Sequence, residues 1–172
     1  PAGAAELGAA LTDVPFDWGQ VKLVPGLSAN DAAGIAEVMR GEETQVVGML
    51  AAIGSSGVAC LPGTHSKWAR VADGRIIGFD THMTGETFAA LRGHTILSRM
   101  MREGPADGAT FDAGVQRSGD GGGLLHHVFG VRAQTLAGRL EETDSAAYLS
   151  GILFRDAVRA ALAGACGTVV HV

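Results

Sequence analysis

The chain has 172 residues, of which 47% are hydrophobic and 18% are charged, and its formal net charge at pH 7 is −5. This length and apolar content are sufficient to bury a core, and they exclude an intrinsically disordered chain. The negative charge argues against a basic face that neutralises nucleic-acid phosphates, so we expect no nucleic-acid partner.

The first half of the chain predicts short elements separated by turns. Residues 4–11 are compatible with a short helix, and residues 21–24 with a strand that ends at a Pro-Gly turn. Residues 26–34 are rich in small and polar side chains and predict a loop. From Glu42 to Ile53 apolar residues recur at helical spacing, and two acids occupy the first turn of the predicted helix.

Three strand candidates follow, at residues 58–61, 67–72 and 75–80. An Asp-Gly pair at positions 73–74 separates the last two strands. This pair is typical of a tight hairpin turn, because both central positions of such a turn favour positive φ.

The second half of the chain predicts helices, at residues 84–91, 95–102, 124–140 and 145–162. The third of these carries an apolar stripe, formed by Leu125, Val128, Phe129, Leu136 and Leu140. A glycine-rich loop at residues 118–123 precedes it, and residues 168–172 return to a strand-like sequence. Together these elements predict an α/β fold in which helices pack on a mixed sheet.

The two cysteines, Cys60 and Cys166, each lie in an apolar stretch without a second cysteine nearby. This pattern indicates reduced thiols rather than a disulfide framework or a zinc site. No apolar run approaches the ~18 residues of a membrane span, and the first residues lack the basic start of a signal peptide. We therefore expect a cytoplasmic protein without a membrane partner. The missing initiator methionine predicts a chain that is cut at its start, and the strand-like GTVVHV predicts a cut at its end.

The segment LPGTHSKW contains the loop that joins the strands predicted at residues 58–61 and 67–72, and this loop is rich in polar side chains. Successive backbone N–H groups in such a loop form a concavity that suits an anion. Gly63 permits close approach, Thr64 and Ser66 offer hydroxyl donors, and His65 or Lys67 offers positive charge. The alternative is an ordinary solvated loop, since no Walker sequence GxxxxGK[ST] is present.

Glu42 and Glu43 begin the predicted helix, in the segment MRGEETQ. The plain interpretation is that both acids interact with the helix dipole, which stabilises the helix by roughly 0.3–1 kcal/mol each. The alternative is that one carboxylate takes a proton from an attacking hydroxyl, as in phosphoryl transfer. Arg40, just before them, either forms a surface ion pair or binds a carboxylate through its guanidinium fork.

Two further motifs have structural explanations. His126 and His127 are adjacent on a helix and point in different directions, so we expect one partly buried and one exposed histidine and no metal chelation. No other group has the paired spacing of a metal site, so no protein metal site is predicted. Thr84, in THMTGE, is predicted to cap the following helix.

Six segments of the chain occur together in one order: VPGLS, VMRGEETQ, LPGTHSKWARVADGRI, THMTGETFAALRGHTILSRMM, GGLLHHVFGVRAQTL and YLSGILF. In this order and spacing they resemble the 2-dehydro-3-deoxygalactonokinase family, sugar-acid kinases of the actin, hexokinase and Hsp70-like ATPase superfamily. The resemblance implies a ribonuclease-H-like lobe. It also implies ATP-dependent phosphorylation of 2-dehydro-3-deoxy-D-galactonate at the 6-hydroxyl, with Mg2+, in galactonate degradation.

The same resemblance implies roles for the polar residues. The residues from Gly63 to Lys67 match the second phosphate motif of the superfamily and would contact ATP. Glu42 or Glu43 would be the catalytic base, with Glu42 favoured because it directly follows a glycine. Arg40 would bind the carboxylate of the sugar acid, and Thr84 would line the cleft as an alternative to capping.

The chain departs from the family at both ends. Such kinases open with a DWGTT-like hairpin, the first phosphate motif, and continue into an adenosine loop, and neither is present. FDWGQ, at residues 16–20, lacks the threonine pair, and we interpret it as unrelated. We expect residues 1–40 to be an interdomain lead-in and residues 41–172 to be the second lobe, incomplete at its C-terminus. The chain alone should then be inactive.

Two other functions are compatible with the sequence. One is a non-catalytic anion-binding or interaction module derived from a kinase lobe. The other is a hydrolase that uses Ser66 and His65, which is disfavoured because adjacent strand-end residues diverge and no third member is evident. The sequence leaves a homodimer open.

Overall fold

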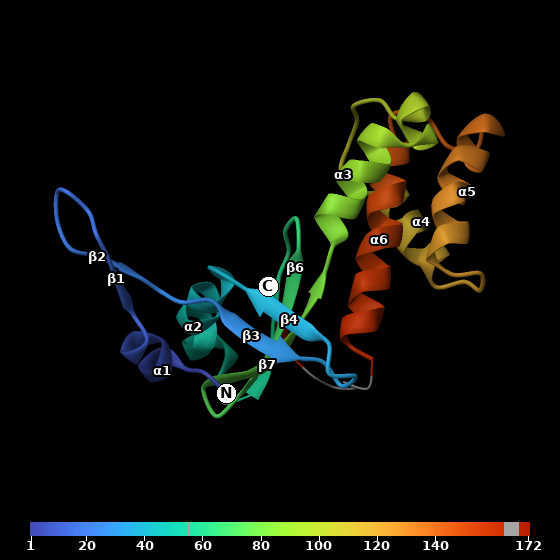
Figure 1. The fold of residues 1–172 in the computed structure, drawn as a ribbon. Helices are drawn as coiled ribbons and strands as arrows, with labels where there is room; N and C mark the ends of the chain where they lie inside the picture. Colours follow the sequence, from blue (N-terminus) through green and yellow to red (C-terminus); the bar gives the residue numbers. More distant parts are fainter. Residues whose placement is uncertain (55, 164–168) are drawn as a thin grey trace. The chain divides into compact units, whose positions relative to one another are not determined.

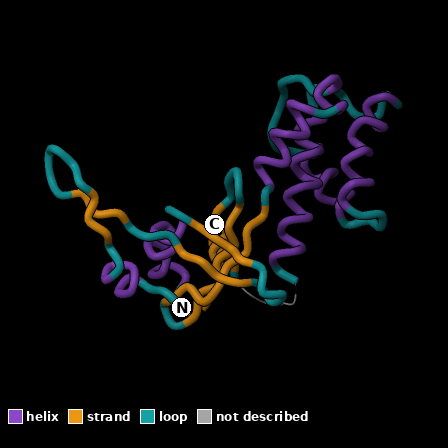
Figure 2. The backbone as a smooth tube through the Cα atoms, viewed as in Figure 1, coloured by secondary structure: helices purple, strands orange, loops and turns teal. Residues whose placement is uncertain are grey.

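The computed structural model describes residues 1–54, 56–163 and 169–172. They form two compact units, one built mainly on strands and one built on helices (Figures 1 and 2). The first unit comprises Pro1–His82 and the C-terminal strand, and the second comprises the helices that follow Met83. Cys166, predicted to be a reduced thiol, and Thr168, the first residue of the strand predicted at residues 168–172, lie outside the described residues.

The first unit contains a four-stranded sheet of order β7-β6-β5-β8. Its strands are β5 (Ser56–Leu61), β6 (Ser66–Ala72), β7 (Arg75–His82) and β8 (Val170–His171). β5, β6 and β7 pair antiparallel, and β8 pairs parallel to β5 on its other side. The predicted hairpin turn is confirmed, since Asp73 and Gly74 both have positive φ, at 51° and 67°.

The helix α2 (Glu42–Ile53) packs against this sheet with the bounds that the sequence predicts. Val46 and Ile53 are buried at 0% and 6% exposure and carry the contact from the helix side. The core they complete consists of Met39, Val46, Ile53, Ala59, Leu61, Ala69, Val71, Ile76 and Phe79. Burial of an aliphatic or aromatic side chain of this size contributes about 1.5–3 kcal/mol, so this core holds the first unit together.

Three small elements precede α2: the helix α1 (Ala4–Ala9), the hairpin of β1 (Thr12–Val14) with β2 (Val21–Leu23), and the hairpin of β3 (Leu27–Asn30) with β4 (Ala36–Met39). The prediction of a loop over residues 26–34 was therefore wrong for β3. Leu27 and Ala29 alternate with polar residues and pack on the core, but they are too few and too small to give a strand signal. Asp31 organises the turn, because its Oδ1 accepts hydrogen bonds from the N–H groups of Ala33 and Ile35, both at 2.8 Å.

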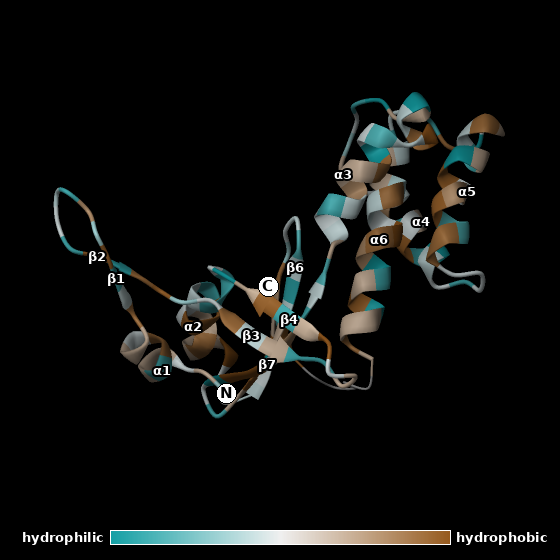
Figure 3. Ribbon diagram, in the orientation of Figure 1, coloured by the Kyte–Doolittle hydropathy of each residue, from teal (hydrophilic) through white to brown (hydrophobic). Residues whose placement is uncertain are grey.

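The second unit is a bundle of α3 (Thr84–His94), the 3-10 helix η1 (Ile96–Met100), α4 (Ala109–Ser118), α5 (Leu124–Leu136) and α6 (Ser145–Ala161). Along α5 and α6, hydrophobic and hydrophilic segments alternate (Figure 3). Its core consists of Leu97, Met101, Val131, Tyr148, Leu149, Ile152 and Leu153. None of the helices in the described part of the chain combines the length and the apolar character that a membrane crossing requires.

The close packing of α4 on α6 explains why the sequence did not reveal α4. A Cβ built on Gly114 of α4 would overlap the carbonyl oxygen of Tyr148, and one built on Gly151 of α6 would overlap that of Phe111. Glycine at these positions lets the two backbones approach each other. The same glycine weakens the helical signal of residues 109–118, because glycine in a helix interior is unfavourable relative to alanine.

Other predictions for the helices need correction. The α-helix predicted at residues 95–102 is instead the shorter 3-10 helix η1, Ile96–Met100, with Thr95 as its cap. The N-cap of α3 is Met83 instead of Thr84. α5 ends at Leu136, before Gly138 at φ 66°.

The predicted apolar stripe of α5 divides into two parts. Val128 and Leu140 pack on the core of the second unit. Leu125, Phe129 and Leu136 are 86%, 60% and 63% exposed instead of buried. The predicted stripe is therefore wrong as the buried face of α5, since three of its five members are exposed and Leu140 lies beyond the end of the helix. The buried residues of α5 are His127 and Val131.

Candidate functional site

The start of α2 is a compact hydrogen-bonded corner. Gly41 caps the helix at φ 114°, a conformation that L side chains disfavour. The carboxylate Oε2 of Glu42 accepts from the N–H of Arg40 at 3.1 Å, and Oε2 of Glu43 accepts from the N–H of Gly41 at 2.7 Å. Thr44 Oγ1 donates to the carbonyl of Gly41 at 2.5 Å. The corner therefore holds both carboxylates in defined positions.

A cavity of about 590 Å³ lies beside this corner in the first unit. It is lined by Gly26, Leu27, Ser28, Val38, Met39, Arg40, Glu42, His65 and Lys67. The cavity thus brings together Arg40 and Glu42 from the segment before and at the start of α2 with His65 and Lys67 from the segment that joins β5 to β6. Glu42 and Glu43 were both candidates for the catalytic base. Glu42 lines this cavity, whereas Glu43 is buried, with 1% of its surface exposed.

Lys67 is the buried cation of the cavity, with 5% of its surface exposed. Its Nζ donates to the carbonyl of Val38 at 2.6 Å and to Thr81 Oγ1 at 3.0 Å. These contacts join β6 to both β4 and β7, but both acceptors are neutral oxygens. A buried ammonium is unfavourable unless its charge is compensated, so the cavity is suited to receive an anion.

The loop between β5 and β6 is open rather than packed shut. Pro62, Gly63, Thr64 and His65 are exposed, whereas Ser66 is 7% exposed. Ser66 Oγ lies 3.3 Å from the backbone N of Gly63, which donates to it, and 3.4 Å from the carbonyl oxygen of Gly63, to which it donates. The Ser66 hydroxyl therefore holds the turn, and the exposed groups of the loop are those that a ligand can reach.

The remaining predicted site residues lie elsewhere. Gly63, Thr64 and Ser66 are next to His65 in the chain without lining the cavity, and Thr84 belongs to the second unit.

Sequence reasoning missed two contributors to this site. Gly26 approaches the corner closely, since a Cβ built on it would overlap the carbonyl oxygen of Met39. The segment VPGLS contains this glycine, and an isolated glycine at a strand start is the signal that could have found it. Thr81 was missed because of the register: counting from the Asp-Gly turn pairs Lys67 with Asp80, but a bulge at Arg70 and Val71 shifts the partner to Thr81.

Comparisons with known proteins identify the family of the chain. Residues 1–172 match the family model described as 2-keto-3-deoxy-galactonokinase. The chain is 41% identical over 169 residues to a protein of Rhizobium meliloti (strain 1021) described as a probable 2-dehydro-3-deoxygalactonokinase, covering 95% of this chain and 55% of the relative. It is 34% identical over 155 residues to the 2-dehydro-3-deoxygalactonokinase of Escherichia coli (strain K12), covering 89% of this chain and 51% of the relative.

A solved structure has the same fold. The crystal structure of a protein from Sinorhizobium meliloti assigned as a 2-dehydro-3-deoxygalactonokinase superposes with a TM-score of 0.88 at 40% identity. The match covers 99% of this chain and 58% of that one. The α/β fold with helices on a mixed sheet, which the sequence predicts as a ribonuclease-H-like lobe, is thereby confirmed. The chain spans about half the length of the curated relatives it matches.

Proposed function

The chain belongs to the 2-keto-3-deoxy-galactonokinase family, and we propose that it forms part of an ATP-dependent kinase that phosphorylates 2-dehydro-3-deoxy-D-galactonate at its 6-hydroxyl. One observation carries the proposal beyond the family match. A single cavity gathers a buried ammonium, a guanidinium and a carboxylate held at a helix start. The cations suit anionic substrates, and the carboxylate suits proton removal from a hydroxyl.

In this proposal Glu42 is the catalytic base. The 6-hydroxyl oxygen attacks the γ-phosphorus in line, the bond from that phosphorus to the bridging oxygen breaks, and ADP leaves. The hydroxyl proton passes to Glu42, whose carboxylate lines the cavity. Glu43 has a structural role, because its buried carboxylate accepts the N–H of Gly41 and fixes the corner.

The cations of the cavity divide between the two substrates. Arg40, exposed at the rim, is placed to bind the sugar-acid carboxylate through its guanidinium fork. Lys67 contributes a fixed positive charge at the wall. The exposed loop from Gly63 to His65 would contact phosphate oxygens, with the Thr64 hydroxyl as a donor, while the N–H of Gly63 already donates to Ser66. Thr84 remains a candidate for contact with the sugar.

A nucleotide brings most of its own metal ligands. Mg2+ in phosphoryl-transfer enzymes is held by one or two carboxylates together with the phosphates of the substrate. The described residues contain no group of three or more histidine, cysteine or acidic side chains placed to hold a metal. The Glu42 carboxylate is compatible with a Mg2+ held mainly by ATP, and the metal would then neutralise charge on the phosphoryl oxygens.

We assign residues 41–172 to the second lobe of a cytoplasmic kinase and residues 1–40 to the lead-in from the first lobe. The helical unit is then an insertion between β7 and β8 of that lobe, which the parallel pairing of β8 with β5 supports. We expect no turnover from these 172 residues alone, because the first phosphate motif of the family is not among them. A homodimer remains part of the proposal.

A coupled ADP-release assay on the full-length protein tests the function. 2-Dehydro-3-deoxy-D-galactonate and its gluconate epimer are offered in parallel with ATP and Mg2+, and we expect turnover of the galactonate-derived acid. ATP consumption without a phosphorylated sugar acid, or no turnover of either epimer, would overturn the kinase assignment. Binding of the sugar acid without turnover would instead favour the non-catalytic module.

A further inference from the structure

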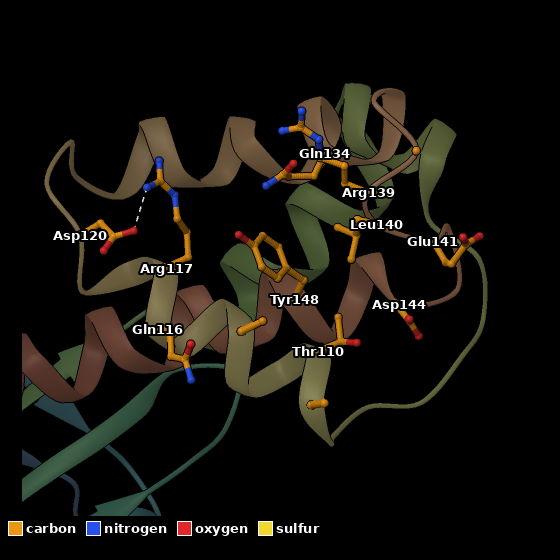
Figure 4. Close-up of a pocket in the computed structure, with 13 residues that line it drawn as sticks. Thr110, Gln116, Arg117, Asp120, Gln134, Arg139, Leu140, Glu141, Asp144 and Tyr148 are labelled. Atoms are coloured by element: carbon orange, nitrogen blue, oxygen red, sulfur yellow. Dashed lines mark hydrogen bonds and ion pairs between the residues drawn. The ribbon is translucent and has the colours of Figure 1, made fainter.

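The helical unit contains a cavity of its own, of about 640 Å³, among α4, the end of α5 and the start of α6 (Figure 4). It is lined by Ala109, Thr110, Ala113, Gln116, Arg117, Asp120, Gln134, Gly138, Arg139, Leu140, Glu141, Asp144 and Tyr148. The proposed kinase reaction uses none of these residues. The volume is within the range of small-molecule sites, and the lining is mostly polar.

Tyr148 is the buried polar group of this cavity. Its side chain is 8% exposed, and Figure 4 shows the hydroxyl directed into the space bordered by Arg117 and Gln134. The hydroxyl forms no hydrogen bond with another residue in the described part of the chain. Although most of the Tyr148 side chain is buried, its hydroxyl is not among the buried unpartnered polar atoms of the described residues, so a molecule in the cavity can reach it and accept its proton.

Burial keeps the hydroxyl of Tyr148 protonated and therefore a hydrogen-bond donor. Burial raises the pKa of Tyr148, Arg117 opposes that change and Asp120 adds to it, so the net effect is an increase. Arg117 is itself paired with Asp120 at 2.9 Å, as the dashed line in Figure 4 marks. The phenol is therefore neutral at physiological pH and donates its proton to an acceptor on the ligand.

The rest of the lining supplies a second cation and a set of mixed donors and acceptors. Arg139 borders the cavity, and no carboxylate of the described residues forms an ion pair with it. Gln116 and Gln134 each offer an amide donor and acceptor, while Glu141 and Asp144 offer acceptors alone. The Arg139 guanidinium and the amide N–H groups can donate to a carboxylate of a ligand, and the carboxylates of Glu141 and Asp144 can accept from its hydroxyl groups.

This combination selects among ligand classes. Few apolar side chains line the cavity, which disfavours a purely hydrophobic ligand. The carboxylates of Asp120, Glu141 and Asp144 disfavour a highly charged polyphosphate. We propose that this cavity binds a small polyhydroxylated carboxylate, a sugar acid, with its carboxylate on Tyr148 and Arg139 and its hydroxyls on the glutamines and the acids. This site is separate from the cavity beside α2 and does not depend on the kinase reaction.

The test uses the full-length protein and D-galactonate as the probe, with binding followed by titration calorimetry and by hydrogen exchange. We expect D-galactonate to slow exchange in residues 109–120 and 134–148. Galactitol, which lacks the carboxylate, and hexanoate, which lacks the hydroxyls, are the matched ligand controls and should not do so.

Two variants locate the site. Tyr148→Phe removes only the hydroxyl, and Arg139→Gln changes an exposed side chain, so both should fold, which thermal unfolding checks. Each should weaken D-galactonate binding by about tenfold through the loss of a hydrogen bond to a charged group. Glu42→Gln, in the other cavity, should leave the exchange protection of the helical unit unchanged.

Three results would overturn the proposal: no binding at millimolar D-galactonate, binding by both variants as tight as by the unsubstituted protein, or protection confined to the region beside α2. Because the readout is binding rather than turnover, a failed kinase assay with intact protection of the helical unit would reject only the proposed function.

Discussion

The carboxylates of Glu42 and Glu43 have different surroundings although the two residues are adjacent. Glu42 lines the cavity beside α2 and accepts the N–H of Arg40, whereas Glu43 is 1% exposed and accepts the N–H of Gly41. At the start of α2, the carboxylate of Glu42 is therefore accessible to a ligand, whereas that of Glu43 stabilises the backbone through a buried hydrogen bond. This difference makes the two acids a matched pair for mutagenesis.

Glu42→Gln in the full-length protein should lower kcat by about 100-fold or more, because the amide cannot accept the hydroxyl proton. The melting temperature should change little, since Glu42 is only half-buried. Glu43→Gln should have the reverse profile, with a lower melting temperature and a smaller loss of kcat. Steady-state kinetics and thermal unfolding on both variants check this, and a larger rate loss for Glu43→Gln would exchange their roles.

Lys67→Met should destabilise the protein by about 1–3 kcal/mol, because it leaves the Val38 carbonyl and the Thr81 hydroxyl without their buried donor. It should also raise KM for the anionic substrate, since the fixed positive charge of the cavity is lost. Thr81→Val is the matched control, which removes one acceptor and keeps the ammonium. Urea unfolding measures the loss of stability, and substrate titration measures KM. An equal increase of KM in Thr81→Val would contradict a binding role for Lys67.

Gly41→Ala should destabilise the protein by about 1–3 kcal/mol, because alanine is strained at the φ of 114° that the corner requires. Gly48→Ala, in the same helix, is the control. A Cβ at Gly48 meets nothing within 4 Å, so the substitution should stabilise the helix by roughly 0.5–1 kcal/mol. The urea midpoint should fall for Gly41→Ala and rise for Gly48→Ala. A rise for both variants would show that the corner tolerates a side chain at position 41.

Cys60 should resist alkylation in the folded protein. Burial raises the pKa of its thiol, so little thiolate is present at pH 8, and the side chain is 5% exposed. The unfolded thiol ionises at lower pH than the folded one, so the contribution of Cys60 to stability falls as pH rises above the unfolded pKa. Mass spectrometry of the Cys60 peptide after iodoacetamide treatment should show slow labelling until denaturant is added, and rapid native labelling would be inconsistent with burial.

The sequence predicts the elements whose local signals are strong. The Asp73-Gly74 hairpin and the helix Glu42–Ile53 have the predicted positions, because turn chemistry and apolar periodicity decide them locally. The contrast between a buried and an exposed histidine also holds, since His127 is 1% exposed beside the exposed His126. β3 and α4 were missed because tertiary packing, rather than local propensity, stabilises them.

The candidate site follows the same division. Arg40, Glu42, His65 and Lys67 could be chosen from the chemistry of their side chains, and the structure places all four around one cavity. Their partner Thr81 could not be chosen, because a bulge in the hairpin changes which residue faces Lys67.

The parallel pairing of β8 with β5 has a consequence for synthesis on the ribosome. Val58 pairs with Val170, so the fourth strand of the sheet is added only after the whole helical unit has been translated. The antiparallel strands β5 to β7 can form early, whereas one edge of β5 stays unpaired and open to wrong partners until β8 has left the ribosome. Rapid folding of the helical unit would shorten that interval, because β8 could then pair with β5 as soon as it emerges.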